Sequence, residues 1–263
     1  MRIVISSEIL SKFPQISVGV LVAKVEVLKS HPYVEKIKEG LSDALNAMGV
    51  KAGGVGTHPD IAVWRKIYKS EFGVDSGKYP SAIESLVKRV AGGKKMWDIS
   101  SVVDLYNSVA VSTLLPMGAY DASTIKGDVI LRYGKSGEIF RGLGSHAEMT
   151  VDPKHIVYAD SENVLTWLWN HKDAEHCGVT EKTQYAIFFA DSAYPGTSSV
   201  KKPVELLAEH LKQIGCTPIQ MAVLDRNSSE MRVEISDLRQ SISLGKGEVG
   251  EEIEKKINNL NLK

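Results

Sequence analysis

The chain has 263 residues, which is enough to bury a sizeable core as one large domain or two small ones. Hydrophobic residues make up 43% of it and charged residues 24%, a composition that excludes a disordered or fibrous protein. Lysine plus arginine balance aspartate plus glutamate, and this neutral total counts mildly against a nucleic acid as a partner.

The N-terminal part predicts two strands, over residues 2–5 and 16–27, and then a helix. Apolar residues at helical spacing place this helix from about 32 to 48, after His31-Pro32. Gly49 follows it, the residue type that favours the left-handed position after a helix. Residues 50–59 are glycine-rich and predict a loop. They lack the lysine and hydroxyl that a phosphate-binding P-loop needs.

Three helices are predicted next. Asp60 is expected to cap the first, which carries Trp64 and ends at about Phe72. The second begins after Pro80, where Ser81 and Glu84 match a capping box and favour structural roles for both residues. The third and central helix covers 99–115 and is stopped by Pro116. A turn is expected after it, at Gly118 and Asp121.

The remaining elements are mostly strands. They are predicted at 128–132, after 137–138, at 155–160, at 185–190 and at 218–224, with a helix over 202–214. The 164–170 segment is too aromatic to assign. Strands and helices do not alternate strictly, which favours an α+β fold with helices packed on a largely antiparallel or mixed sheet. We expect a single domain over 1–224 and a peripheral charged extension over 225–263.

Neither a membrane segment nor a secretory signal is expected. The longest apolar run, 16–28, is interrupted by Lys24 and is too short to cross a bilayer. The N-terminus has no basic segment followed by an apolar core and a cleavage site. Two cysteines, Cys177 and Cys216, make no disulfide framework. These observations predict a cytoplasmic protein.

Basic residues are concentrated between Trp64 and Lys95, despite the neutral total. This stretch has a surplus of five positive charges, which can form a phosphate-facing patch or simply solvated helix faces. The candidates for contact with a nucleic-acid backbone are Lys66, Lys69, Lys88 and Arg89.

Several unusual residue blocks together resemble a known family. They are Trp64-Arg65-Lys66, Tyr79-Pro80-Ser81, Asp104-Leu105-Tyr106-Asn107, Leu115-Pro116, Gly118-Ala119-Tyr120-Asp121 and the strand ending in Arg132. In combination they resemble the B3/B4 domain, the tRNA-editing module of the phenylalanyl-tRNA synthetase beta subunit, and in particular its free-standing version. The resemblance covers roughly residues 15 to 215 and is strongest over 60–195. It implies an α+β fold.

The resemblance also implies a pocket for an aminoacyl group on tRNA. Polar side chains that can supply hydrogen bonds there are Asn107, Arg65, Tyr79, Ser81, Tyr120 and Asn170. Trp64, Trp169 and Met117 can supply an apolar wall. Asn107 is the first candidate for a catalytic role, because its amide can donate to an ester carbonyl and accept from a ribose hydroxyl.

The chain departs from the family pattern at three places. Gly118 stands where the synthetase module has a histidine, and His155 where free-standing members have a glutamate. Trp167-Leu168 replaces a pair of arginines before Trp169-Asn170. His155 is therefore a second catalytic candidate, as a replacement for a lost group.

The sequence gives little support for a metal site, a dinucleotide site or a covalent nucleophile. His171, His176 and Cys177 are metal-ligand types, but their spacing fits no common zinc pattern, so neither a metal nor a cofactor is expected. Gly245, Gly247 and Gly250 match a dinucleotide motif that leaves no room for a second strand. No Gly-x-Ser-x-Gly elbow is present, and neither cysteine lies in an activating motif.

Our leading hypothesis is a free-standing aminoacyl-tRNA deacylase that acts in trans on misacylated tRNA without an obligate protein partner. An aminoacyl ester is an activated bond, so positioning a water and stabilising the oxyanion is enough for hydrolysis. The alternatives are a non-catalytic module that binds tRNA or an amino-acid-like ligand, and hydrolysis of an unrelated ester or amide. Nothing resembles the ATP-dependent core of a ligase.

Overall fold

The computed structural model describes residues 1–145, 147–194 and 199–235. Contacts divide the chain into two units, Met1–Arg232 and Val233–Lys263. The first unit contains all the helices and strands given below. The glycine motif at 245–250 and most of the expected C-terminal extension lie outside the described residues.

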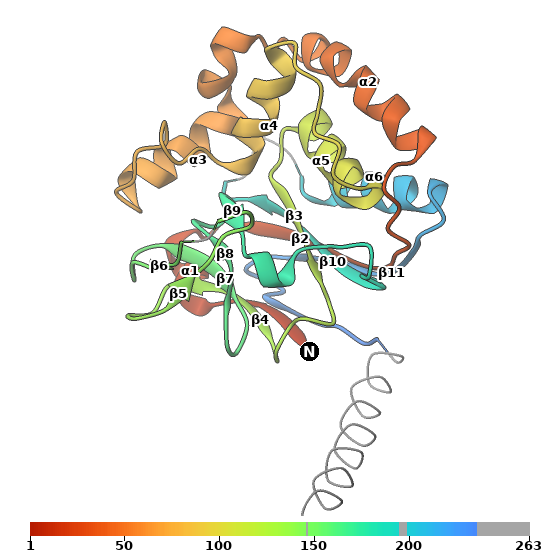
Figure 1. The fold of residues 1–263 in the computed structure, drawn as a ribbon. Helices are drawn as coiled ribbons and strands as arrows, with labels where there is room; N and C mark the ends of the chain where they lie inside the picture. The colour runs from red at the N-terminus through yellow and green to blue at the C-terminus, as the bar shows by residue number, and fades with distance from the viewer. Residues whose placement is uncertain (146, 195–198, 236–263) are drawn as a thin grey trace, which may run out of the picture. The chain divides into compact units, whose positions relative to one another are not determined.

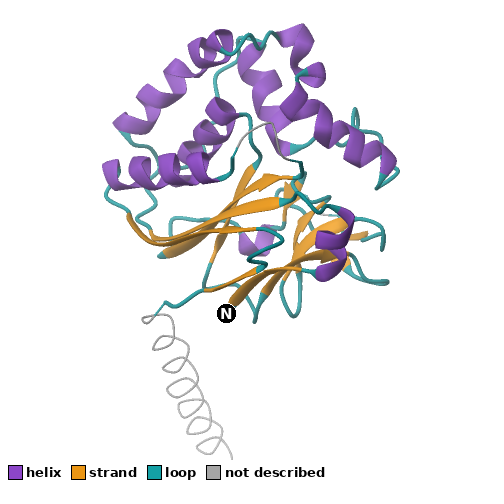
Figure 2. Ribbon diagram, turned by 180° about the vertical axis from the view of Figure 1, so that it is seen from behind, coloured by secondary structure: helices purple, strands orange, loops and turns teal. Residues whose placement is uncertain are grey.

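The first unit contains two main sheets, a short third sheet and the α-helices that pack with them. Its α-helices are α1 (Ser7–Lys12), α2 (Pro32–Ala47), α3 (Pro59–Ser70), α4 (Ala82–Ala91), α5 (Ser101–Thr113) and α6 (Lys201–Gln213). Its strands are β1 (Arg2–Ile5), β2 (Ser17–Lys24), β3 (Met117–Asp121), β4 (Val129–Tyr133), β5 (Ile139–Phe140), β6 (Met149–Thr150), β7 (Ile156–Ala159), β8 (Val164–Trp167), β9 (Lys172–Asp173), β10 (Tyr185–Ser192), β11 (Thr217–Leu224) and β12 (Glu230–Arg232). Helices α2 to α6 gather on one side of the unit and the strands of both sheets on the other (Figures 1 and 2).

The four-stranded sheet has the order β11-β2-β10-β3 and is antiparallel throughout. Its central strands, β2 and β10, are nearly continuous runs of buried residues, as expected for strands covered on both faces. Helix α6 packs on β2 at Gly19, where an added Cβ would lie only 2.5 Å from Val204 Cγ2. A larger residue at this position would push the helix off the sheet.

The six-stranded sheet has the order β12-β1-β4-β7-β8-β9. Every pair in it is antiparallel except β1 with β4, which run parallel. The architecture is therefore α+β with mixed and antiparallel sheets, and the fold-class prediction is confirmed. Strand β12 pairs with β1, so residues 230–232 belong to this sheet although the sequence suggested a boundary at 224.

Local structure follows the sequence closely in the helices. The predicted helix at 32–48 is α2, and Gly49 adopts φ +72° directly after it. Helix α4 has Ser81 as its N-cap, with the Ser81 hydroxyl accepting from Glu84 N at 3.3 Å. The reciprocal half of the capping box is absent, because the Glu84 carboxylate instead pairs with Arg65 and Lys88.

Three local predictions are wrong. The turn expected at Gly118 and Asp121 begins only at Asp121, where Thr124 N donates to Asp121 O, because pairing with β10 draws residues 117–121 into strand β3. The cap of α3 is His58, whose ring accepts from Asp60 N, and Asp60 lies inside the first turn. The expected loop over 50–59 contains a 3-10 helix, Ala52–Thr57.

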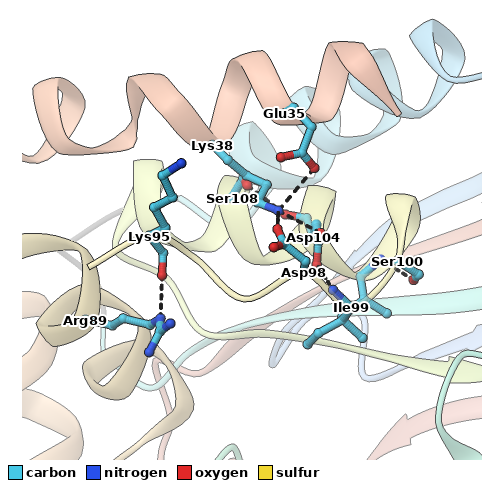
Figure 3. A network of polar contacts seen from close by, with 10 residues as sticks. Glu35, Lys38, Arg89, Lys95, Asp98, Ile99, Ser100, Asp104 and Ser108 are labelled. Carbon is cyan, nitrogen blue, oxygen red and sulfur yellow. Dashed lines mark hydrogen bonds and ion pairs between the residues drawn. The ribbon is translucent and has the colours of Figure 1, made fainter. Parts of the chain in front are cut away.

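Beneath α2, a buried ammonium group organises the helical layer. Lys38 Nζ contacts Asp104 of α5 at 3.0 Å, Glu35 at 3.2 Å, and Asp98 in the segment before α5 (Figure 3). Asp104 also accepts from Ile99 N at 3.0 Å. Glu35, Asp98 and Asp104 lie close enough together to hold a cation, and Lys38 supplies that charge itself. Within the described residues, none of the helices has the length and apolar content that crossing a membrane requires.

Removing the ammonium should therefore destabilise the fold. Lys38→Met leaves the buried Asp104 carboxylate without its cation, and we expect a loss of about 3–5 kcal/mol in the free energy of unfolding. Urea denaturation measures this loss. Lys36→Met, on the exposed face of the same helix, is the matched control and should change stability by less than about 0.5 kcal/mol. Equal effects of the two substitutions would contradict the proposed role of Lys38.

Candidate functional site

A small cavity lies where the two main sheets meet. Its volume is about 60 Å³, room for only a few water molecules. It is lined by Ala82 of α4, Met117, Gly118 and Tyr120 of β3, Tyr158 of β7, Thr166 of β8, residues 169–173, and Phe189 and Asp191 of β10. β3 and β9 are edge strands of their sheets, so the cavity lies at the edge of each. A space this small accommodates the polar reacting group of a ligand rather than a large side chain.

The turn at 168–170, between β8 and β9, has an unusual backbone. Leu168 and Trp169 have φ values of 52° and 63°, in the left-handed region that bulky residues rarely occupy. The turn is closed by a 2.7 Å hydrogen bond from Asn170 N to Leu168 O, and Trp169 N donates to Ile156 O at 2.7 Å. Such strain costs about 1–3 kcal/mol per residue and persists only where surrounding contacts over-determine it. It is also concentrated at functional sites.

Aromatic packing holds this turn in place. The Trp169 ring is fully buried and meets Trp64 and Phe13 edge-on, at centroid distances of 5.2 and 5.1 Å. The Tyr68 hydroxyl of α3 lies 2.8 Å from Leu168 O and 2.9 Å from Asn170 Oδ1. Helix α3 therefore fixes the turn from behind, and Trp64 acts as a wall for Trp169 rather than for a ligand.

Two buried polar groups of the turn make no hydrogen bond of normal geometry among the described residues, although the Trp169 indole N–H faces the Asp191 carboxyl and lowers its pKa. These are Trp169 Nε1 and Asn170 Nδ2. The single Tyr68 proton cannot serve two acceptors, and turning the Asn170 amide over would let its Nδ2 donate to Tyr68. In either orientation one end of the amide stays available. Because an unsatisfied buried group costs about 1–3 kcal/mol, both groups favour a ligand with hydrogen-bonding atoms.

Two carboxyl groups line the same cavity. Asp191 is 4% exposed and accepts from the Tyr158 hydroxyl at 2.5 Å. Asp173 accepts from the Thr166 hydroxyl at 2.5 Å, and Thr166 in turn is bonded to the Tyr120 hydroxyl. Burial raises the pKa of Asp191 to about 7 and that of Asp173 to about 6. Each carboxyl is held by a hydroxyl group, which stabilises the ionised form less than a cation would.

His171 adds a third acid–base group to the cavity wall. Its Nδ1 lies 2.5 Å from Pro80 O, and a carbonyl can only accept, so Nδ1 carries the proton. Burial lowers the pKa of His171, which favours the neutral ring with Nε2 as an acceptor. Asp173 and Asp191 thus give the site groups that can take up a proton near neutral pH, and His171 adds a hydrogen-bond acceptor.

The structure brings together five of the residues singled out from the sequence: Met117, Gly118, Tyr120, Trp169 and Asn170. The others serve elsewhere. Trp64 packs behind Trp169, Arg65 binds the buried carboxylate of Glu84, and Ser81 caps α4. Tyr79 lines a neighbouring hollow of about 200 Å³ with Phe140 and Trp167, which shares His171 and Lys172 with the cavity.

Neither predicted catalytic residue lines the cavity. Asn107 lies on α5, partly exposed, and makes no side-chain hydrogen bond within the described residues. His155 is 7% exposed, and its Nδ1 accepts from Trp167 Nε1 at 3.1 Å while its ring packs against Phe72. Burial lowers the pKa of His155, so the ring is a neutral part of the core. These contacts give His155 a structural role.

The four predicted phosphate contacts differ in their surroundings. Lys66 and Lys69 are exposed on α3. Lys88 lies 2.6 Å from the Glu84 carboxylate, and Arg89 is turned towards the main chain and an aromatic ring. The side chains of His171 and Cys177, weighed as metal ligands, bond to backbone carbonyl oxygens, and His176 lines a different hollow.

Sequence reasoning missed the acid–base groups of the cavity. Asp173, Asp191 and Tyr158 lie in or beside strands and carry no motif that the sequence argument used. A weak signal was present: Asp191 ends a long apolar strand, where an acidic side chain is out of place.

Comparison with known proteins identifies relatives of this chain. The B3/4 domain family model matches residues 65–202, just over half of the chain. The phenylalanine–tRNA ligase beta subunit of Solibacter usitatus is 40% identical over 68 residues, which is 26% of this chain and 9% of that protein. The corresponding subunit of Chromobacterium violaceum is 34% identical over 104 residues, 37% of this chain and 13% of that one.

A third similar subunit, from Paramagnetospirillum magneticum, is 30% identical over 122 residues, 46% of this chain and 14% of that one. The match thus spans only about a tenth of the length of these relatives. An N-terminal fragment of the phenylalanyl-tRNA synthetase beta subunit from Pyrococcus horikoshii aligns with a TM-score of 0.41 and 13% identity, covering 89% of this chain and 54% of that one. The family match covers all the cavity-lining residues, and the chain belongs to the B3/4 domain family.

Proposed function

We propose that this protein is an aminoacyl-tRNA deacylase that acts in trans on misacylated tRNA and hydrolyses the ester without a metal or cofactor. The observation that carries the proposal is the cavity itself. It combines the buried indole donor Trp169 Nε1, which faces the Asp191 carboxyl without a hydrogen bond of normal geometry, with two carboxyl groups whose pKa values burial raises to about 6 and 7. Hydrolysis of an activated ester needs a proton acceptor beside a donor for the oxyanion.

The proposed chemistry needs only a water molecule. An ionised carboxylate of the Asp173–Asp191 pair takes a proton as the water oxygen attacks the ester carbonyl. The resulting oxyanion accepts from Trp169 Nε1 and from Asn170 Nδ2. The ester C–O bond then breaks, and the leaving ribose oxygen takes up the proton, which restores the carboxylate. The strained turn preorganises the donors, so no side chain has to move during the reaction.

A non-catalytic binding module is the alternative, and one observation favours it. Gly118 faces Asp173 across the cavity, and a Cβ added to this glycine would lie 3.6 Å from Asp173 Oδ2. The histidine that the synthetase module carries at this position is therefore missing from beside the carboxyl group. The same pocket would then bind an aminoacyl end without cleaving it.

A panel of mischarged tRNAs distinguishes the two functions. We expect the purified protein to release the amino acid from at least one of them, and Asp173→Asn to slow this release by about 10²-fold or more. Asp43→Asn, on the exposed face of α2, is the matched control and should leave the rate unchanged. Tight binding of a mischarged tRNA whose ester stays intact throughout the panel would establish the binding module instead.

The raised carboxyl pKa values predict opposite pH trends for rate and stability. Release should accelerate as pH rises from about 5 to 8, because the ionised carboxylate is the base. The contribution of Asp191 to the free energy of unfolding should fall over the same range, since folded Asp191 still holds a proton that the unfolded chain, with its lower pKa, has released.

Asp191→Asn isolates the stability effect. Relative to the wild type, the variant should be unchanged in stability near pH 4 and more stable by up to roughly 4 kcal/mol at pH 8, because each pKa unit corresponds to about 1.4 kcal/mol. Thermal unfolding across this range measures the difference, and buried histidines cancel in the comparison. A difference that does not vary with pH would show that Asp191 ionises normally.

The exposed lysines of α3 are proposed to contact the tRNA backbone. Lys66→Glu with Lys69→Glu should weaken tRNA binding and make it less sensitive to salt, because fewer counterions are released. Filter binding between about 50 and 200 mM salt measures both properties. Lys202→Glu with Lys212→Glu, on α6, applies the same charge change elsewhere. If both double variants behave alike, net charge rather than this patch determines the affinity.

A further inference from the structure

One tryptophan is exposed, and it lies outside the cavity. Trp64, Trp167 and Trp169 are at most 6% exposed, whereas Trp97 is 45% exposed. It belongs to the segment 93–99, which joins α4 to α5. Leaving a large apolar ring in water forgoes the free energy that its burial would provide, and a flat exposed ring can stack on another flat group.

The 93–99 segment is tightly held, so its exposed ring is fixed in position. Asp98 pairs with Lys38 at one end, and Ile99 N donates to Asp104. At the other end Arg89 Nε donates to Lys95 O at 2.5 Å (Figure 3). The same guanidinium lies 4.2 Å from the centroid of the Trp97 ring. Trp97 and Arg89 form a preorganised stack, which we name the Trp97 platform.

Charge around the Trp97 platform is nearly balanced. A hollow of about 290 Å³ beside the segment is lined by Lys38, Lys94 and Lys95 and equally by Glu35, Glu39 and Asp98, while Arg89 adds one positive charge. Such a surface neither attracts nor repels phosphate strongly. A ligand would therefore bind here through stacking more than through charge, and bases are the flat groups that stack on aromatic rings and guanidinium planes.

We propose that the Trp97 platform binds an unstacked base of the tRNA, as a second contact apart from the cavity. This inference rests on the proposed function in one respect, which is that the nucleic acid is a tRNA. A base laid on the indole is held by stacking, and Arg89 supports the ring and supplies a donor to a neighbouring phosphate.

Uncharged tRNA is the probe for this proposal. Binding of the tRNA should quench the fluorescence of Trp97. The contribution of Trp97 is the part of the tryptophan fluorescence that is lost in Trp97→Phe. Trp97→Phe keeps a stacking ring and should retain most of the affinity, whereas Trp97→Leu should weaken binding about 5- to 100-fold. This loss should be nearly the same at low and high salt, unlike the loss from substituting Lys66 and Lys69. Ile99→Ala, at a residue 54% exposed, is the matched apolar control and should bind normally.

A small aminoacyl ester of adenosine separates this contact from the cavity. Trp97→Leu should cleave it at the wild-type rate and lose efficiency only on full-length tRNA. If tRNA quenches Trp97 in the wild-type protein but no amino acid is released, the deacylase proposal is wrong and the Trp97 platform is still supported. If the protein releases amino acid but tRNA does not quench Trp97, and Trp97→Leu is as active on full-length tRNA as the wild type, the platform proposal is wrong.

Two further outcomes are decisive. If Trp97→Leu fails to fold, acrylamide quenching of the wild type with and without tRNA tests the same point, since a stacked base should shield the ring. Shielding that grows with protein concentration in the absence of tRNA would show that Trp97 contacts a second copy of the chain, and the proposal would be wrong.

Discussion

The burial of one tryptophan holds the candidate site together. Trp169 adopts a left-handed backbone conformation that opposes its own steric preferences, next to Leu168 in the same condition. Packing against Phe13 and Trp64, with the Tyr68 hydroxyl on the turn, offsets this strain. Burying a ring of this size contributes several kcal/mol, enough to hold two strained residues. The cavity wall is thus rigid because a larger core stands behind it.

The buried carboxyl groups of the protein have two kinds of surroundings. Asp104 and Glu84 each lie against cations, Lys38 in one case and Arg65 with Lys88 in the other. Both belong to the helical layer and stabilise the contacts between helices. Asp173 and Asp191 are held by neutral donors, hydroxyl groups at both and the Trp169 indole at Asp191, and they lie beside the cavity. Ionising them is costly, which is a poor arrangement for stability and a suitable one for moving a proton near neutral pH.

What could be predicted from the sequence depends on how local the determining contacts are. Helices α2 and α4 follow from apolar spacing and end signals within a few residues of one another, and the motif blocks indicate the family. Strand β3 was mistaken for a turn because only pairing with β10, some seventy residues away, makes it a strand. Asp191 meets Tyr158 across 33 positions, and Tyr120 meets Thr166 across 46. No local pattern records such contacts, so the acid–base groups emerged only from the fold, while Asn107, chosen for its place in a motif, lies away from the cavity.

The place of β1 in the six-stranded sheet has a consequence for the order in which the protein folds. This strand is made first, yet its neighbours are β4 and β12, which follow about 125 and 230 residues later along the chain. During synthesis β1 emerges without a partner, and one of its edges stays open until the last strand of the unit has been made. The helical layer, built from contacts closer in sequence, can assemble earlier. Closing the long loops between β1 and its partners is slow, and an unpaired strand edge invites pairing with other chains meanwhile.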